Sequence, residues 1–207
     1  ALTDADNNVA IGYSAMTTNV LGSESVAIGT YALNSQNPAT AVNMYNVAVG
    51  HNTGAAVTTG VRNTLIGGLA GDAITTGGDN VSVGANALTA NTTASNNTAV
   101  GSASLISNTT GANNTGLGNS ALYANTTGAN NTAVGYQALD ANTTAANNTA
   151  VGVSSLGANT TGAGNVAFGA EALSTNVLGS NSTAIGREVL KTQNPASAAD
   201  TDNTAVG

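Results

Sequence analysis

The sequence predicts an all-β chain that folds as a parallel β-solenoid, for two reasons. First, twelve glycines recur along the 207 residues, and nine of the eleven intervals between them are 17 residues long. Such a short fixed period is typical of solenoids, in which each repeat is one turn of backbone stacked on the next. Second, the residues before each of these marker glycines alternate with the period of a β-strand. The marker glycines are Gly12, Gly29, Gly50, Gly67, Gly84, Gly101, Gly118, Gly135, Gly152, Gly169, Gly186 and Gly207.

Composition and charge argue against several other classes of protein. Only 6% of residues are charged and 3% are aromatic, a bias also found in disordered chains. Disorder, however, does not require apolar residues to stay in register over twelve repeats. The net charge is −7, and the three bases Arg62, Arg187 and Lys191 are too few to follow a phosphate backbone. We therefore expect no nucleic-acid partner.

Membrane insertion and cysteine chemistry are not expected in this segment either. No apolar run approaches the roughly 20 residues of a membrane-spanning helix. The chain has no cysteine, which rules out disulfides and is compatible with an extracellular location.

The first predicted strand of each repeat ends at the marker glycine. The residue before the glycine is Ile, Val, Leu or Phe, and the residue three before it is Val or Thr. Between them stands a small residue in eleven repeats, with Leu65 as the exception. Because side chains alternate across a strand, we assign the Val/Ile side to the interior and the alanine side to a flat outer strip. The glycine is expected to have a positive φ or to meet a crowded neighbour.

A second short strand is predicted four residues after the marker glycine, where Leu or Met stands in nine of eleven repeats. Its leucine is expected in the core. Gly54 and Gly71 interrupt this column in consecutive coils, so we expect a local thinning or bulge there. The coil then closes through a far turn such as Asn91–Thr93, where Asn accepts left-handed backbone and caps the turn.

Both 21-residue intervals, in segments 30–50 and 187–207, contain a proline, Pro38 and Pro195. We expect these insertions to protrude as loops, because proline cannot donate to a strand ladder. The prolines lie 157 residues apart, and the sequences before them also match. We therefore expect residues 1–207 to be a single repetitive β-solenoid segment of a longer fibre protein.

A rod of such small coils is expected to associate with copies of itself. The few apolar side chains that one coil can bury offset little more than the entropy cost of ordering its backbone. We expect further stability from packing of the alanine strip in a closed, symmetric homo-oligomer.

The string Asn131–Gly135 (Asn-Thr-Ala-Val-Gly) has close variants at Asn8–Gly12 and Ser25–Gly29. It resembles the head repeat of YadA-like trimeric autotransporter adhesins and the related repeats of bacteriophage tail fibres. The resemblance covers the whole chain and implies a left-handed parallel β-roll, homotrimeric and extracellular, that serves attachment. The coils of the adhesin heads are shorter than those of this chain.

No residue pattern indicates catalysis, so we expect no enzyme, no catalytic residue and no cofactor. His51 has no acidic partner nearby in the sequence and is expected on the surface. The acid pairs Asp4/Asp6 and Asp200/Asp202 suggest weak calcium binding at most, and a solvated turn is favoured, so no metal site is expected. The asparagines four before the glycines are expected to form a side-chain amide ladder. The Asn-Thr strings also match the acceptor pattern for N-linked sugars. The Asn- and Thr-rich composition is the favoured explanation, and glycosylation is the alternative.

These expectations favour the shaft or head of an extracellular fibre, either a cell-surface adhesin, a filament or a phage tail fibre. Its partners would be copies of itself, most simply in a trimer, together with a host-surface receptor or glycan. The alternative is an ice-binding or glycan-binding solenoid, suggested by the stacked Thr-Thr pairs of the far turn. Only one threonine of each pair would face water, because adjacent residues of an extended chain point to opposite sides.

Overall fold

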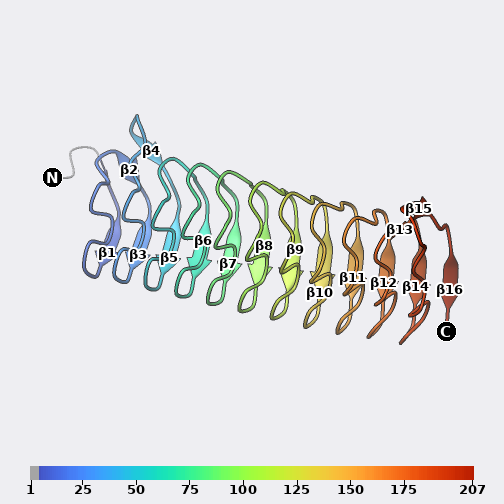
Figure 1. The fold of residues 1–207 in the computed structure, drawn as a ribbon. Helices are drawn as coiled ribbons and strands as arrows, with labels where there is room; N and C mark the ends of the chain where they lie inside the picture. The colour runs from blue at the N-terminus through green and yellow to red at the C-terminus, as the bar shows by residue number, and fades with distance from the viewer. Residues whose placement is uncertain (1–4) are drawn as a thin grey trace.

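The computed structural model describes residues 5–207 as a rod of stacked coils (Figure 1). Twelve strands form one parallel sheet along the rod. The described residues contain no helix. The strands of this sheet are β1 (Val9–Ile11), β3 (Val26–Ile28), β5 (Val47–Val49), β6 (Thr64–Ile66), β7 (Val81–Val83), β8 (Thr98–Val100), β9 (Thr115–Leu117), β10 (Thr132–Val134), β11 (Thr149–Val151), β12 (Val166–Phe168), β14 (Thr183–Ile185) and β16 (Thr204–Val206).

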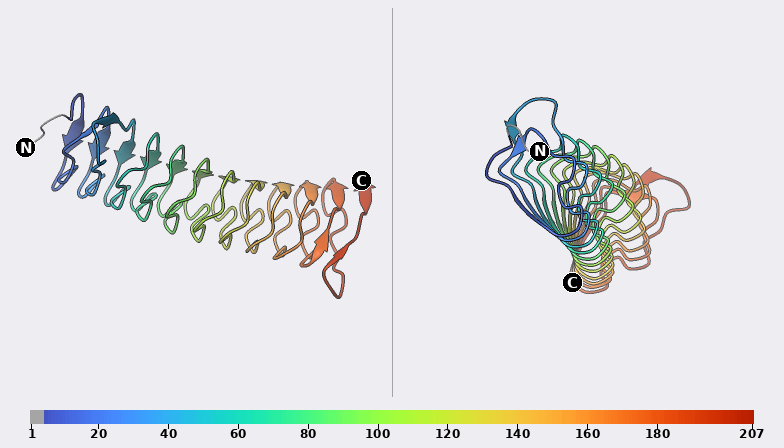
Figure 2. Two further views of the ribbon diagram at one scale, coloured as in Figure 1. Left: turned by 90° about the horizontal axis from the view of Figure 1, so that it is seen from above. Right: turned by 90° about the vertical axis from the view of Figure 1, so that its left-hand side faces the viewer.

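Each strand of the main sheet pairs with its equivalent in the next coil, in chain order. Thr132, for example, lies beside Thr149, and Ala133 lies beside Ala150. Seen from the end of the rod, the successive coils lie nearly on top of one another (Figure 2). The sequence prediction of a parallel β-solenoid with one turn per 17 residues is therefore confirmed.

The strand faces, however, are the reverse of those expected. The small residue between the two β-branched ones points into the coil, and Ala99, Ala133 and Ala150 are fully buried. The large apolar residues point outward, so that Ile11 is 58% exposed and Phe168 56% exposed. The assignment of Val and Ile to the interior, and of an alanine strip to the outer surface, is therefore wrong.

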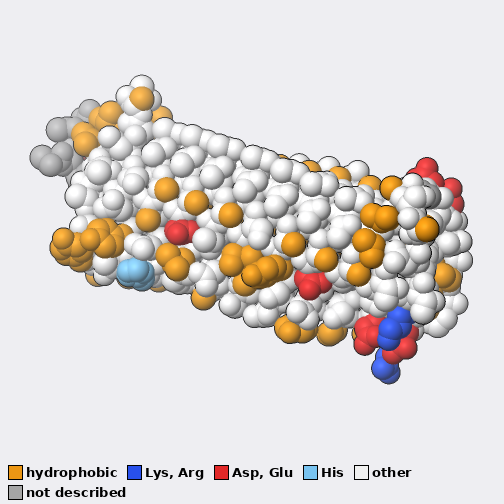
Figure 3. Space-filling view, in the orientation of Figure 1, with side chains coloured by type: hydrophobic (Ala, Val, Ile, Leu, Met, Phe, Trp, Pro, Cys, Tyr) orange, Lys and Arg blue, Asp and Glu red, His pale blue; other side chains and the backbone are white. Residues whose placement is uncertain are grey.

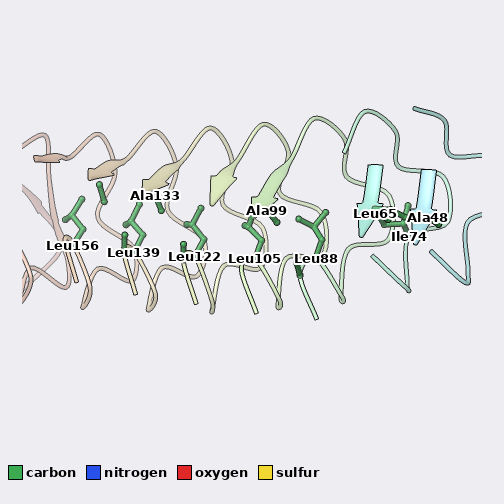
Figure 4. Close-up of a cluster of buried hydrophobic side chains, with 14 of the residues drawn as sticks. Ala48, Leu65, Ile74, Leu88, Ala99, Leu105, Leu122, Ala133, Leu139 and Leu156 are labelled. Atoms are coloured by element: carbon green, nitrogen blue, oxygen red, sulfur yellow. The ribbon is translucent and has the colours of Figure 1, made fainter. Parts of the chain in front are cut away.

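The narrow width of the coil explains this reversal. The inward side of each strand faces the leucine of the opposite wall, and Figure 4 shows Leu105, Leu122 and Leu139 in a row along the rod. Gly116 stands where other strands have alanine, and a Cβ added there would already lie 3.5 Å from Cγ of Leu105. Large side chains on both walls would collide, so the strand contributes the small one.

The leucines lie in the core as predicted, but they do not belong to a second strand. They sit in a turn with left-handed backbone, where φ is 51° at Leu105 and 52° at Leu139. The residue before each leucine, for example Ala138, is also buried. Two consecutive inward side chains are incompatible with the alternation of a strand, and the positive φ makes this arrangement possible. The predicted second strand is therefore wrong.

The core remains filled where glycines interrupt the leucine column. A Cβ on Gly54 would lie 2.7 Å from Cδ1 of Leu65, and one on Gly71 would lie 2.9 Å from Cδ2 of the same leucine. Val57 and Ile74, three residues after these glycines, are also fully buried. Leu65 thus occupies the space that two leucines leave, and the expected thinning of the core does not occur.

The marker glycines are required for both of the predicted reasons. From Gly12 to Gly186 their φ values lie between 127° and 141°. This region is almost exclusive to glycine. A Cβ on Gly29 would also lie 2.3 Å from the carbonyl oxygen of Gly50 in the next coil.

Two rows of buried asparagine connect the coils. In the row four residues before the glycines, the backbone N–H of Asn131 donates to Oδ1 of Asn114 at 3.0 Å, and most coils of this row are joined in the same way. The predicted side-chain amide ladder is present there only in part, for example where Nδ2 of Asn80 donates to Oδ1 of Asn63 at 3.1 Å. The far turn supplies the second row, in which Nδ2 of Asn125 donates to Oδ1 of Asn108 at 2.8 Å. Nδ2 of Asn125 also caps its own turn by donating to the carbonyl of Gly128. The far-turn asparagines were also expected to have left-handed backbone. That conformation occurs instead at the asparagine five residues further on, such as Asn130 with φ 58°.

The two long coils add small parallel pairs outside the main sheet. Strand β2 (Gly22–Ser23) pairs with β4 (Val42–Asn43), and β13 (Gly179–Ser180) pairs with β15 (Ala199–Asp200). The loops that carry β4 and β15 stand out from the stack, as the end-on view of Figure 2 shows. Pro38 lies buried at the base of the first loop, and residues 39–43 beyond it are exposed.

Candidate functional surface

The outward side of the main sheet runs along the whole described rod. Each strand contributes the aliphatic residue before the marker glycine and the β-branched residue two positions earlier. We call these two columns the outer sheet face. No charged residue occurs in either column in any of the twelve coils. The residues before the glycines are Ile11, Ile28, Val49, Ile66, Val83, Val100, Leu117, Val134, Val151, Phe168, Ile185 and Val206.

These side chains are exposed or half-buried, because no other segment of residues 5–207 packs over them. Leu117 is 45% exposed, Ile185 is 42% exposed, and the valines between them are half-buried by their neighbours in the column. Apolar side chains, exposed or half-buried and stacked in register over twelve coils, form one long apolar strip. Contiguous apolar strips of this kind on a folded protein mark interaction surfaces.

The far turn has a different character. The first threonine of each pair is half-buried, and its hydroxyl donates to a carbonyl of the next coil, as Thr109 does to Thr126 at 3.0 Å. The second threonine, such as Thr110 or Thr127, is exposed. As the sequence indicated, only one threonine per coil faces water.

The residues that the sequence offered as site candidates, a histidine and two acid pairs, do not form a common site. His51 is exposed, as expected, with its backbone carbonyl accepting a hydrogen bond from Leu69. Asp6, Asp200 and Asp202 belong to coils at opposite ends of the rod, and Asp4 lies outside the described residues. Within residues 5–207 no three His, Asp or Glu side chains are grouped so that they could hold a metal ion.

Charged side chains are few, and their ion pairs are exposed. Arg62 binds Asp79 of the next coil through two hydrogen bonds, Nε to Oδ1 at 2.6 Å and Nη2 to Oδ2 at 2.8 Å. The hydrogen bond from Arg62 lowers the pKa of Asp79. At the other end of the rod Lys191 pairs with Glu171 and lowers the pKa of its carboxyl group. On the face shown in Figure 3, the basic side chains gather at this end.

Two half-buried aspartates differ from these pairs. Asp72 and Asp140 both lie five residues after a marker glycine, and burial raises the pKa of each carboxyl group. Oδ1 of Asp72 is buried without a hydrogen-bond partner. They lie in different coils, 68 residues apart, and so do not form a carboxylate pair.

The described part of the chain has no helix long and apolar enough to cross a membrane. Its surface offers one apolar strip, rows of hydroxyl and amide groups, and two protruding loops. Comparison of the chain with models of protein families, with curated proteins and with solved structures finds no match.

Proposed function

We propose that this chain forms the shaft or head of an extracellular fibre, such as an adhesin, a surface filament or a phage tail fibre. The observation that supports this most is the unbroken ladder of twelve parallel strands, in which every coil is bonded to the next at the same positions. Such a ladder makes a stiff rod, because a bend would have to break several backbone hydrogen bonds of a coil together. Supporting a load and presenting a surface are tasks that such a rod performs without catalytic groups.

We propose that the rod works as a homo-oligomer, in the homotrimer that the resemblance to YadA-like adhesin heads implies. The outer sheet face takes the place of the predicted alanine strip as the contact between copies. It is free of charge and has the same spacing in each copy, so the rows of one rod can pack between those of another. Three rods that each present one apolar face to a common axis bury all three faces in a closed arrangement.

Imaging of residues 1–207 by negative-stain electron microscopy, with a mass measurement by light scattering, tests this proposal. We expect thin straight rods whose mass is a multiple of the 19.8 kDa chain. A monomer in solution would contradict the oligomer, and a compact particle would contradict the fibre.

Ice binding is the second candidate, favoured by the column of exposed threonines that includes Thr93, Thr110 and Thr127. A thermal-hysteresis assay on the purified chain separates the two functions. An ice-binding protein produces a gap between the melting and freezing points, whereas a fibre shaft produces none.

A further inference from the structure

The first insertion is held at its base by a set of polar contacts. Oε1 of the buried Gln36 accepts a hydrogen bond from Nδ2 of Asn46 at 2.9 Å, and Nε2 of Gln36 donates to Oγ of Ser25 at 3.3 Å. Oδ1 of Asn37 accepts from the backbone N–H of Val20 in the preceding coil at 3.3 Å. We call this arrangement the loop bracket. It fixes the chain on both sides of residues 38–45.

The second insertion repeats the loop bracket with the equivalent residues. Oε1 of Gln193 accepts from Nδ2 of Asn203 at 2.7 Å, and Nε2 of Gln193 donates to Oγ of Ser182 at 2.9 Å. Oδ1 of Asn194 accepts from the backbone N–H of Val177 at 3.2 Å. The same base is therefore built twice, nine coils apart.

The tips that these two brackets present differ in chemistry. The first tip has Val42, Asn43 and Tyr45, of which Val42 is 40% exposed and Tyr45 53% exposed. The equivalent region of the second tip has Asp200 and Asp202. A base kept unchanged beneath tips of different chemistry indicates that the base is a scaffold and that the tips serve recognition.

The column that contains Tyr45 changes its residue type from coil to coil near the first tip, from Glu24 through Tyr45 to Arg62 and Asp79. Nδ2 of Asn43 donates to the hydroxyl of Tyr45 at 2.9 Å, which fixes the ring relative to the amide. In the next coil the backbone N–H of Arg62 donates to the carbonyl of Met44 at 2.8 Å, so the Arg62–Asp79 ion pair continues the same column. Later coils have asparagine in this column, for example at residues 96, 113, 130 and 147.

The backbone of Tyr45 follows the general geometry of its column. Its φ is 53°, and Arg62 and Asp79 in the next two coils have φ 56° and 58°. The ring itself is 53% exposed and lies outside the core.

We propose that Tyr45 and Asn43, together with the Arg62–Asp79 pair, form a binding site for a neutral glycan. An exposed aromatic face can pack against the C–H groups of a pyranose ring, while the amide, guanidinium and carboxylate groups bond its hydroxyls. The inference rests on the proposed function in its adhesive form and names the class of ligand. The several copies of the site in the proposed homo-oligomer would raise the apparent affinity of a weak single site.

The charge of the site favours an uncharged ligand. Asp79 neutralises Arg62, and the nearest further charged residue in the column, Glu24 of the preceding coil, is acidic. An acidic sugar or a phosphate would therefore meet a carboxylate without a free base to bind it. Acidic glycans are therefore not the preferred ligand of this site.

Affinity electrophoresis tests the proposal, with the 207-residue chain run through native gels that contain mannan, dextran, galactan or xylan. We expect at least one neutral polysaccharide to retard the chain. Tyr45→Ala should weaken this retardation about tenfold, as loss of a central aromatic contact does. Tyr123→Ala removes a similarly exposed tyrosine from another turn, so it should leave the retardation unchanged.

A variant that exchanges the tips supplies a second test. Val42→Ala, Asn43→Asp and Tyr45→Asp give the first bracket the side chains of the second tip and keep the buried Met44. This variant should form the same rods in the electron microscope and should lose the retardation. Absence of retardation on all four polysaccharides would overturn the proposal, as would unchanged retardation of Tyr45→Ala or of the exchanged tip. Rods that form without glycan binding would leave the fibre function standing.

Discussion

At the scale of single residues, the marker glycines show most directly how the sequence fixes the backbone. Gly118 has φ 140°, and a Cβ there would lie 2.4 Å from the carbonyl oxygen of Gly135. Gly68 is a matched control, because it is exposed and a Cβ there would have no neighbour within 4 Å.

We expect Gly118→Ala to lower the free energy of unfolding by at least about 2 kcal/mol, since both the backbone strain and the steric overlap oppose the methyl group. Gly68→Ala should change it by less than about 0.5 kcal/mol. Urea unfolding followed by circular dichroism measures both. Equal effects of the two substitutions would contradict the steric role of the marker glycines.

Two aspartates should affect the pH dependence of stability in opposite directions. Burial raises the pKa of Asp140 above its ordinary 3.8, so the folded state disfavours the charged carboxylate. This penalty is fully present above the raised pKa and disappears below the ordinary value. Asp140→Asn should therefore raise the stability at pH 7, and the gain should fade as the pH falls toward 3.

Asp79 should behave in the opposite way. Arg62 lowers the pKa of Asp79, so its contribution to stability is present above the ordinary value and lost as the pH falls through the lowered pKa. Asp79→Asn should slightly reduce the stability at pH 7, because an exposed pair contributes little. Melting temperatures measured between pH 3 and pH 7 check both signs, and a pH-independent effect of either substitution would refute the corresponding assignment.

At the scale of the coil, the packing of strand against turn decides which face of the strand is inside. Leu65 and Ile66 are neighbours in β6, and the first is fully buried while the second is 39% exposed. Leu65 packs where Gly54 and Gly71 leave room, so its removal would open a cavity that alanine cannot fill.

Leu65→Ala should reduce the free energy of unfolding by about 3 to 5 kcal/mol, at the upper end for a buried leucine. Ile66→Thr keeps a β-branched residue on the outer sheet face, and it should cost less than about 1 kcal/mol. Guanidinium unfolding of the two variants gives the comparison. A larger loss for Ile66→Thr would mean that the strand faces are as the sequence first suggested.

The sequence predicted the period, the strand, the leucine core and the glycine turns, because each of these repeats in register. Periodicity alone could not decide which side of a three-residue strand is buried. Hydrophobicity favours Val and Ile for the buried side, whereas the narrow coil takes a small residue there wherever the opposite wall has its leucine. One feature of the sequence did indicate the buried side of the strand. Leu65, the large residue at the small position, stands between the two coils that lack the core leucine. The second strand was wrong because alternation cannot reveal a left-handed turn at a non-glycine residue such as Leu105.

At the scale of the whole molecule, the main surface feature is the outer sheet face. The sequence did not predict this face, because Val and Ile were assigned to the interior of the coil. Its apolar side chains lie in one strip, and Val100 and Val134 stand near the middle of the rod. Charges placed there would be tolerated in a single rod but not between packed copies.

Val100→Asp together with Val134→Asp should convert the proposed oligomer into monomers without changing the circular dichroism spectrum, because a buried unpaired carboxylate opposes association. Thr110→Asp with Thr127→Asp places the same charges on the exposed far turn and should leave the mass unchanged. Sedimentation measures all three proteins. An unaltered mass for the valine variant would show that the copies meet elsewhere.

The in-register pairing of equivalent residues has a consequence for how such a chain can change over generations. Since the top edge of one turn and the bottom edge of the following turn match throughout, tandem duplication or loss of 51 nucleotides would lengthen or shorten the rod by a whole step. Both new junctions would already be complementary. Length is thus a trait that this architecture can vary, except around Leu65 and at the two loop brackets, where neighbouring turns depend on one another and must be inherited together.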